Sequence, residues 1–87
     1  MKTLSGVLLV VLTAAFAHAG TPLPVTDVPE KVLSTLREYF PGATPLAAEK
    51  DVQANRTKYE VLVQYKAIQL EVDLAEDGTI LDVDMER

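Results

Sequence analysis

Two neighbouring segments of the chain alternate between apolar and polar residues. Between Thr57 and Tyr65, every second side chain is aromatic or branched: Tyr59, Val61, Val63 and Tyr65. The same alternation resumes at Ile68 and continues to Leu74. Successive side chains of a strand point to opposite faces of a sheet, so the pattern predicts two strands that each bury one face. Their short connection predicts antiparallel pairing.

Weaker segments on either side extend this sheet to four strands. Residues 76–78, Glu-Asp-Gly, predict a tight hairpin turn because glycine tolerates a positive φ. The strand after this turn is expected to point three apolar side chains inward: Leu81, Val83 and Met85. Upstream, Leu46 to Gln53 predicts a first strand, followed by a turn at residues 54–56. Lys66-Ala67, between the central strands, is a poor turn by composition.

A helical period of 3.6 residues precedes these strands. One helical stripe carries four apolar side chains: Val28, Val32, Leu36 and Phe40. Asp27 three residues before Glu30 predicts a capping box, and residues 41–42, Pro-Gly, predict the end of the helix. The expected fold is therefore α+β, with one N-terminal helix packed on a four-stranded antiparallel meander sheet (α-β-β-β-β).

The N-terminus has the three parts of a signal peptide. A basic start at Lys2 is followed by an apolar run centred on residues 7–12 and then by Ala17-His18-Ala19, with small residues at −3 and −1. The run is shorter than the roughly 20 apolar residues of a membrane span. We therefore predict a signal peptide at 1–19, an extended leader at 20–26 and one domain at 27–87, in the periplasm or outside the cell. A retained N-terminal anchor and an ordinary first helix are the alternatives.

The acidic composition limits the classes of partner. Cleavage after Ala19 removes Lys2 but no acid, so the formal charge falls from −5 to −6. Nucleic acid and anionic membrane surfaces would repel such a protein. The chain has no cysteine and thus no disulfide. A domain this small has a weak core, so it must be compact or be helped by a partner or a second copy.

Three segments together cover nearly the whole predicted mature chain: "VPEKVLSTLREYFPGATPLAAEKD", "KYEVLVQY" and "IQLEVDLAEDGTILDVD". In these segments the chain resembles the PepSY-like family, small secreted bacterial domains related to beta-lactamase inhibitor proteins. One departure is Lys66-Ala67, where relatives often carry Asp-Gly or Asn-Gly. The resemblance implies a module that inhibits or chaperones another exported protein such as a peptidase. In the related inhibitor proteins the open face of the sheet binds the target. It implies no catalytic residue.

The residue inventory also argues against an enzyme. The predicted mature chain lacks histidine and cysteine, so Ser–His and Cys–His nucleophilic sites are excluded. Its one serine, Ser34, falls on the polar side of the helix. No residue pattern predicts a cofactor.

The segment "DLAEDGTILDVD" partly matches a calcium-binding loop. Asp73, Asp77 and Asp84 fall at positions 1, 5 and 12, and glycine falls at position 6. Position 3 is Ala75 and the flanks alternate as strands, whereas an EF-hand needs helices there. The preferred interpretation is a hairpin without a metal, and weak calcium binding through these three aspartates is the alternative.

The face of the sheet opposite the helix is predicted to be strongly acidic. We expect it to dock a basic exported protein through six residues: Glu60, Leu62, Glu71, Asp73, Asp82 and Asp84. Leu62 is the apolar residue of this group and is expected to act as an exposed anchor. Three interpretations stay open: a protein-binding module, a calcium-binding envelope protein, and a subunit that self-associates through its edge strands. A face that merely keeps the sheet soluble is the simplest alternative.

Overall fold

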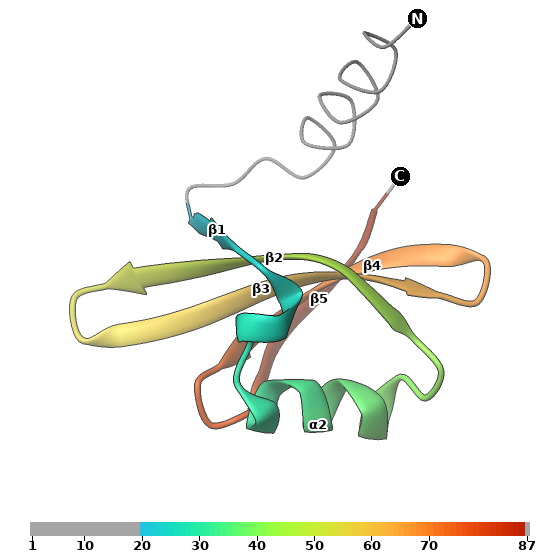
Figure 1. The fold of residues 1–87 in the computed structure, drawn as a ribbon, viewed down its shortest axis with the longest axis horizontal. Coiled ribbons are helices and arrows are strands. Elements are labelled where there is room, and N and C mark those ends of the chain that lie inside the picture. Colours follow the sequence, from blue (N-terminus) through green and yellow to red (C-terminus); the bar gives the residue numbers. More distant parts are fainter. Residues whose placement is uncertain (1–19, 87) are drawn as a thin grey trace, which may run out of the picture.

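The computed structural model describes residues 20–86, which form one α-helix and a five-stranded antiparallel sheet (Figure 1). The elements in chain order are β1 (Thr21–Leu23), the 3-10 helix η1 (Val25–Asp27), α2 (Glu30–Tyr39), β2 (Thr44–Gln53), β3 (Arg56–Tyr65), β4 (Ile68–Ala75) and β5 (Ile80–Glu86). The strands are ordered β1-β2-β3-β4-β5, so every hydrogen-bonded neighbour is also a neighbour in sequence. The α+β class and the four-stranded meander, now β2 to β5, are confirmed. Within the described residues, no helix combines the length and the apolar character that crossing a membrane requires.

The fifth strand, β1, lies in the segment that the sequence predicts to be an extended leader. It pairs with β2, with Thr21 opposite Lys50 and Leu23 opposite Ala48. Leu23 packs against the core. The prediction of four strands is therefore wrong by one, because β1 is made by pairing with residues far along the chain and carries no local pattern of its own. The predicted signal peptide lies outside the described residues.

The N-cap of helix α2 lies two residues later than predicted. The first residue of the helix is Glu30, its N-cap is Pro29, and no side chain caps its N-terminus. Asp27 instead ends η1, where its backbone N–H donates to Pro24. The predicted capping box is thus wrong. The predicted end is confirmed, because the N–H of Phe40 makes the last helical bond, to Leu36 O, and Gly42 follows with a φ of +85°.

The two hairpins around β3 turn without glycine. The first residue of each two-residue loop, Ala54 or Lys66, has a positive φ of 53° or 57°. A positive φ at the first central residue is what a type II′ turn requires. A side chain outside the loop stabilises the turn at Lys66-Ala67. The Gln64 side-chain amide donates to the carbonyls of Lys66 and Ile68 at 3.0 and 3.1 Å. The predicted turn therefore forms despite its composition.

Helix α2 and the central strands enclose the core. The buried apolar side chains share the α2 side of the sheet and the inner side of the helix: Val28, Val32, Leu36, Ala48, Tyr59, Val61, Val63, Leu70, Val72 and Leu74. The face assignment of β3 and β4 is thus confirmed at these positions.

The predicted burial of β5 is wrong. Val83 and Met85 pair with Val72 and Leu70, which places them on the α2 side, yet they keep 41% and 56% of their surface exposed. A helix is about 10–12 Å across and strands lie about 4.8 Å apart, so one helix covers roughly two strands. Leu81 is exposed for another reason. It is the extra residue of a bulge, because Asp73 pairs with Asp82 while Leu74 pairs with Ile80.

Candidate binding surface

The acidic side chains of the predicted docking face line up across the sheet. The strand register forms one row of carboxylates over four strands: Glu49, Glu60, Asp73 and Asp82. A second row, one step along the strands, contains Leu62, Glu71 and Asp84. Side chains directly opposite each other in adjacent strands lie about 5 Å apart, so like charges in a row repel. All six predicted partner-binding residues thus share this face, which we call the acidic face.

The inner part of the acidic face is buried. Glu60 and Glu71 are buried, and Leu62 keeps only 7% of its surface exposed. Leu62 lies at the middle of β3, with Ala47 and Glu71 opposite it on the two neighbouring strands. The expectation that Leu62 is an exposed anchor is therefore wrong.

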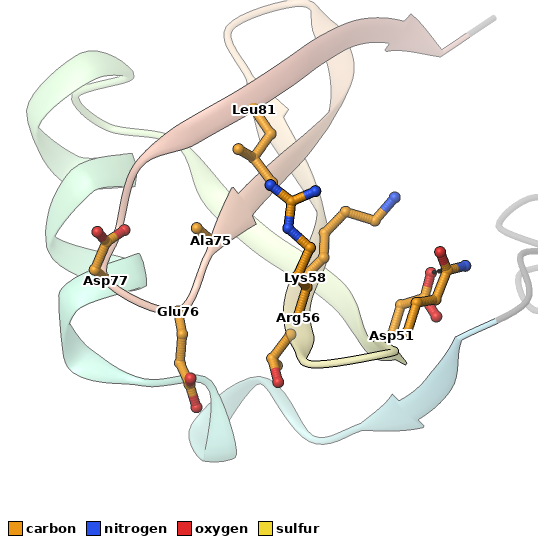
Figure 2. Close-up of a pocket in the computed structure, with 9 residues that line it drawn as sticks. Asp51, Arg56, Lys58, Ala75, Glu76, Asp77 and Leu81 are labelled. Atoms are coloured by element: carbon orange, nitrogen blue, oxygen red, sulfur yellow. Dashed lines mark hydrogen bonds between the residues drawn. The ribbon is translucent and has the colours of Figure 1, made fainter.

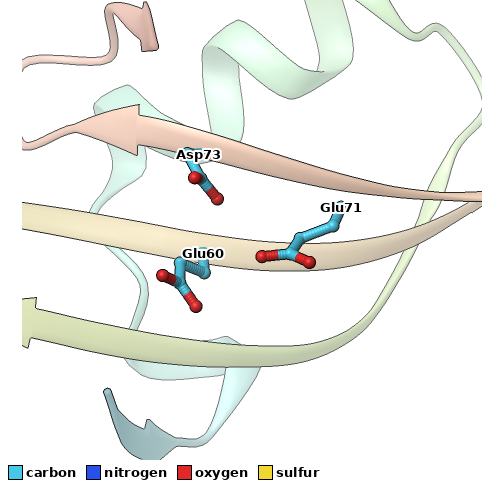
Figure 3. Close-up of side chains that lie close together, drawn as sticks. All are labelled: Glu60, Glu71 and Asp73. Atoms are coloured by element: carbon cyan, nitrogen blue, oxygen red, sulfur yellow. The ribbon is translucent and has the colours of Figure 1, made fainter. Parts of the chain in front are cut away.

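Three carboxylates converge in this buried part (Figure 3). Glu60, Glu71 and Asp73 each place one oxygen within 4.8 Å of the others. The Lys58 ammonium lies beside two of them, 3.3 Å from Glu60 Oε2 and 3.6 Å from Asp73 Oδ2. Lys58 thus partly balances Glu60 and Asp73. Carboxylate oxygens that converge in this way are also the ligands that a hard cation such as Ca²⁺ prefers.

Burial and neighbouring charges shift the pKa values of Asp73 and Lys58. Burial raises the pKa of Asp73, and the charges of Glu60 and Asp82 raise it further, against the opposing effect of Lys58. Burial alone would lower the pKa of Lys58, but its hydrogen bond to Glu60 and the neighbouring acids raise the pKa above its ordinary value. Lys58 therefore stays charged, and Asp73 ionises less readily than an ordinary aspartate.

The outer part of the acidic face, on β5, is exposed to solvent. Asp82 and Asp84 are exposed there, and neither forms an ion pair with a lysine or arginine of residues 20–86. The charge of Asp82, and its hydrogen bond with Asp84, raise the pKa of Asp84. These two aspartates are uncompensated acids that a partner can reach.

The three aspartates of the alternative calcium loop do not form such a loop. Asp77 lies in the β4–β5 turn, where its Oδ1 accepts a hydrogen bond from the Thr79 N–H at 3.0 Å. This bond holds the pKa of Asp77 below its ordinary value. Asp73 and Asp84 lie on the flanking strands, and the turn is closed by Ala75 and Thr79 through a backbone bond of 2.8 Å. The segment is a hairpin, and the carboxylates that do converge are Glu60, Glu71 and Asp73.

The alternation in the sequence predicts that Glu60, Glu71 and Asp73 share one face of the sheet, but not that their carboxylates converge. A two-residue loop at Lys66-Ala67 fixes the register of β3 and β4, and this register puts Glu60 opposite Asp73 and Leu62 opposite Glu71. The hairpin register was the signal that could have found the cluster.

A hollow of ≈ 570 Å³ opens at one end of the sheet, between the β2–β3 hairpin and the β4–β5 turn (Figure 2). Its lining has both signs of charge, and Figure 2 shows Arg56 and Lys58 between Asp51 on one side and Glu76 on the other. Leu81 and Ala75 supply its apolar part. No histidine or cysteine lines it, so it offers neither of the usual residues for a nucleophile and base pair.

Comparison with known proteins gives no match to a family model, to a curated protein or to a solved structure.

Proposed function

We propose that the protein is a non-enzymatic binding module that is exported with the help of a signal peptide at residues 1–19. It binds, and by binding restrains, another periplasmic or secreted protein that has a basic surface. Kinship with the PepSY-like family is part of this proposal and makes an exported peptidase the first partner to test. The supporting observation is the pair of exposed acids, Asp82 and Asp84, which lack a cationic partner within the described residues.

The two parts of the acidic face have different roles in this proposal. Asp82 and Asp84 are exposed and make the contacts with basic side chains of the partner. Glu60 and Glu71 are buried, so they act through the electric field that attracts the partner. Charge complementarity of this kind raises the association rate and rejects acidic competitors more than it adds affinity.

Capture from the native envelope and secreted fractions tests this function. Wild-type protein should recover a basic partner at about 0.1 M salt and lose it near 1 M, because the Debye length shrinks from ~10 Å to ~3 Å. The double variant Asp82→Asn/Asp84→Asn should recover much less. The control Asp27→Asn/Glu38→Gln, which removes two exposed acids elsewhere, should behave like the wild type. Equal recovery by all three proteins at both salt concentrations would contradict the proposal.

Cation binding is a second candidate, supported by the convergence of Glu60, Glu71 and Asp73 within 4.8 Å. The Lys58 ammonium opposes it, because it already lies against two of these carboxylates. Titration calorimetry with calcium chloride separates the candidates. A saturable one-to-one signal that disappears in Glu71→Gln would support a cation site, and a flat trace would remove this candidate without affecting the first.

A further inference from the structure

Among residues 20–86, strand β5 is an edge of the sheet and pairs with β4 alone. The opposite edge is formed by β1, which has three residues, and by the parts of β2 that extend beyond β1. An edge strand presents unpaired backbone N–H and C=O groups along its outer side, and these can pair with another extended chain. Seven residues of β5 are therefore positioned to accept an added strand.

The two faces of β5 differ in chemistry. On the α2 side, Val83 and Met85 are exposed because the helix does not reach them. On the opposite side, Asp82 and Asp84 belong to the acidic face. Natural edge strands are usually protected from pairing by charged side chains, proline or β-bulges. From Ile80 to Glu86, β5 has no lysine and no proline, and its protection consists of three acids and the bulge at Leu81. A basic partner would neutralise these acids, whereas an acidic or neutral one would not.

We propose that β5 accepts an extended basic segment of the exported partner as a sixth strand. Lysine or arginine side chains of this segment meet Asp82 and Asp84, and its alternate apolar side chains cover Val83 and Met85. The inference rests on the proposed function and adds the binding site and the partner's sequence pattern: basic and apolar residues in alternation. Main-chain bonds supply affinity in such strand addition, and the alternating side chains supply selectivity.

A second copy of the protein is a poor occupant of this edge. Side chains alternate along β5, so any β5–β5 pairing that keeps the apolar faces together also keeps the acidic faces together. In the antiparallel arrangement centred on Val83, Asp82 of each copy would lie opposite Asp84 of the other. Like charges directly opposite are destabilising, and the charge of Asp82 already raises the pKa of Asp84 within one chain. A basic strand removes this repulsion, whereas a second copy increases it.

The experiment titrates the mature protein with labelled, end-capped heptapeptides and follows fluorescence anisotropy at low salt. The test peptide alternates lysine with valine. One control peptide replaces every lysine by glutamate. A second control peptide carries N-methyl groups on two consecutive central amides. Because successive N–H groups of an extended chain point to opposite edges, these methyl groups block both edges without changing the charge of the peptide. The lysine peptide should bind saturably, and Asp82→Asn/Asp84→Asn should raise its Kd about tenfold. Asp27→Asn/Glu38→Gln should leave the Kd unchanged. Neither control peptide should bind comparably.

Each alternative outcome overturns the inference in a distinguishable way. If the N-methylated peptide binds as tightly as its parent, charge alone drives binding, and strand addition is wrong while the proposed function survives. If the lysine peptide does not bind at all, strand addition is wrong. The proposed function is then tested independently by the capture experiment. If sedimentation shows a dimer that Asp82→Asn/Asp84→Asn strengthens, the occupant is a second copy. Circular dichroism of each variant verifies that it is folded.

Discussion

The substitution Gly78→Ala, which adds one methyl group, tests the contact between the β4–β5 turn and helix α2. Gly78 lies in the β4–β5 turn with a φ of +94° and is buried against α2. A Cβ at this position would lie 2.7 Å from the Lys31 carbonyl oxygen and 2.7 Å from Thr35 Oγ1. These two atoms are themselves joined by a hydrogen bond of 3.0 Å, so neither can move without breaking it. Gly78→Ala therefore combines backbone strain with a steric clash.

Gly42 provides the matched control. Its φ is +85°, but a Cβ there would meet no atom within 4 Å. Alanine at a left-handed position costs roughly 1–2 kcal/mol, which is the whole expected loss for Gly42→Ala. Overpacking a tight site adds roughly 1–3 kcal/mol, so Gly78→Ala should lose about 2–5 kcal/mol. The difference between the two variants measures the contact between the turn and the helix.

Urea unfolding followed by far-ultraviolet circular dichroism measures both losses. If Gly78→Ala is too unstable to show a folded baseline, adding Thr35→Ala should restore part of its stability, because one of the two clashing atoms is removed. Equal losses for Gly78→Ala and Gly42→Ala would refute the packing of the turn against α2. A double variant no more stable than Gly78→Ala would refute the role of Thr35.

Three other predictions concern the core, the titration and the export of the protein. Val61→Ala should cost about 2–4 kcal/mol because Val61 is 0% exposed. Val52→Ala, at 60% exposure on the same side of the sheet, should stay within about 0.5 kcal/mol in the same urea assay, and similar losses would contradict the burial of Val61 under α2. The pKa of Asp73 is raised in the folded state, so its ionised form destabilises the fold above that pKa; Asp73→Asn should therefore be more stable than wild type at pH 7, and this advantage should vanish below the ordinary pKa of 3.8. An advantage that is independent of pH would rule out ionisation as its cause. Mass spectrometry of the exported protein should find Gly20 as its first residue, and an intact Met1 would contradict cleavage.

Local sequence patterns predict the helices and strands whose formation depends on residues close by in the chain. The alternation through β3 and β4, the helical stripe at Val32 and Leu36, and the Pro-Gly end of α2 each depend on near neighbours, and all three are confirmed. Strand β1 depends on pairing with Ala48–Lys50, a contact more than twenty residues away, so no local pattern marks it. The predicted capping box at Asp27 fails for a local reason, because Val28 and Pro29 after it are extended, with ψ values of 135° and 146°.

The sequence predicts which face of the sheet carries the candidate site, but not which side chains of that face are exposed. Alternation and hairpin register put all six predicted residues on the acidic face. They do not reveal that the inner acids and Leu62 are buried while Asp82 and Asp84 are exposed, because burial depends on the number of strands and on how neighbouring side chains cover the centre of the sheet. The exposure of Val83 and Met85 likewise follows from the width of one helix against five strands, which is a three-dimensional property.

Hydrogen exchange of the mature protein, with and without the captured basic partner, shows directly where the partner docks. Docking at the acidic edge should slow amide exchange in β5, residues 80–86, while β1 and α2 exchange as before. About 1 M salt should abolish this protection, since charge guides the docking. Protection confined to α2 or β1, or protection of β5 that Asp82→Asn/Asp84→Asn leaves intact, would contradict binding through the acidic edge of the sheet.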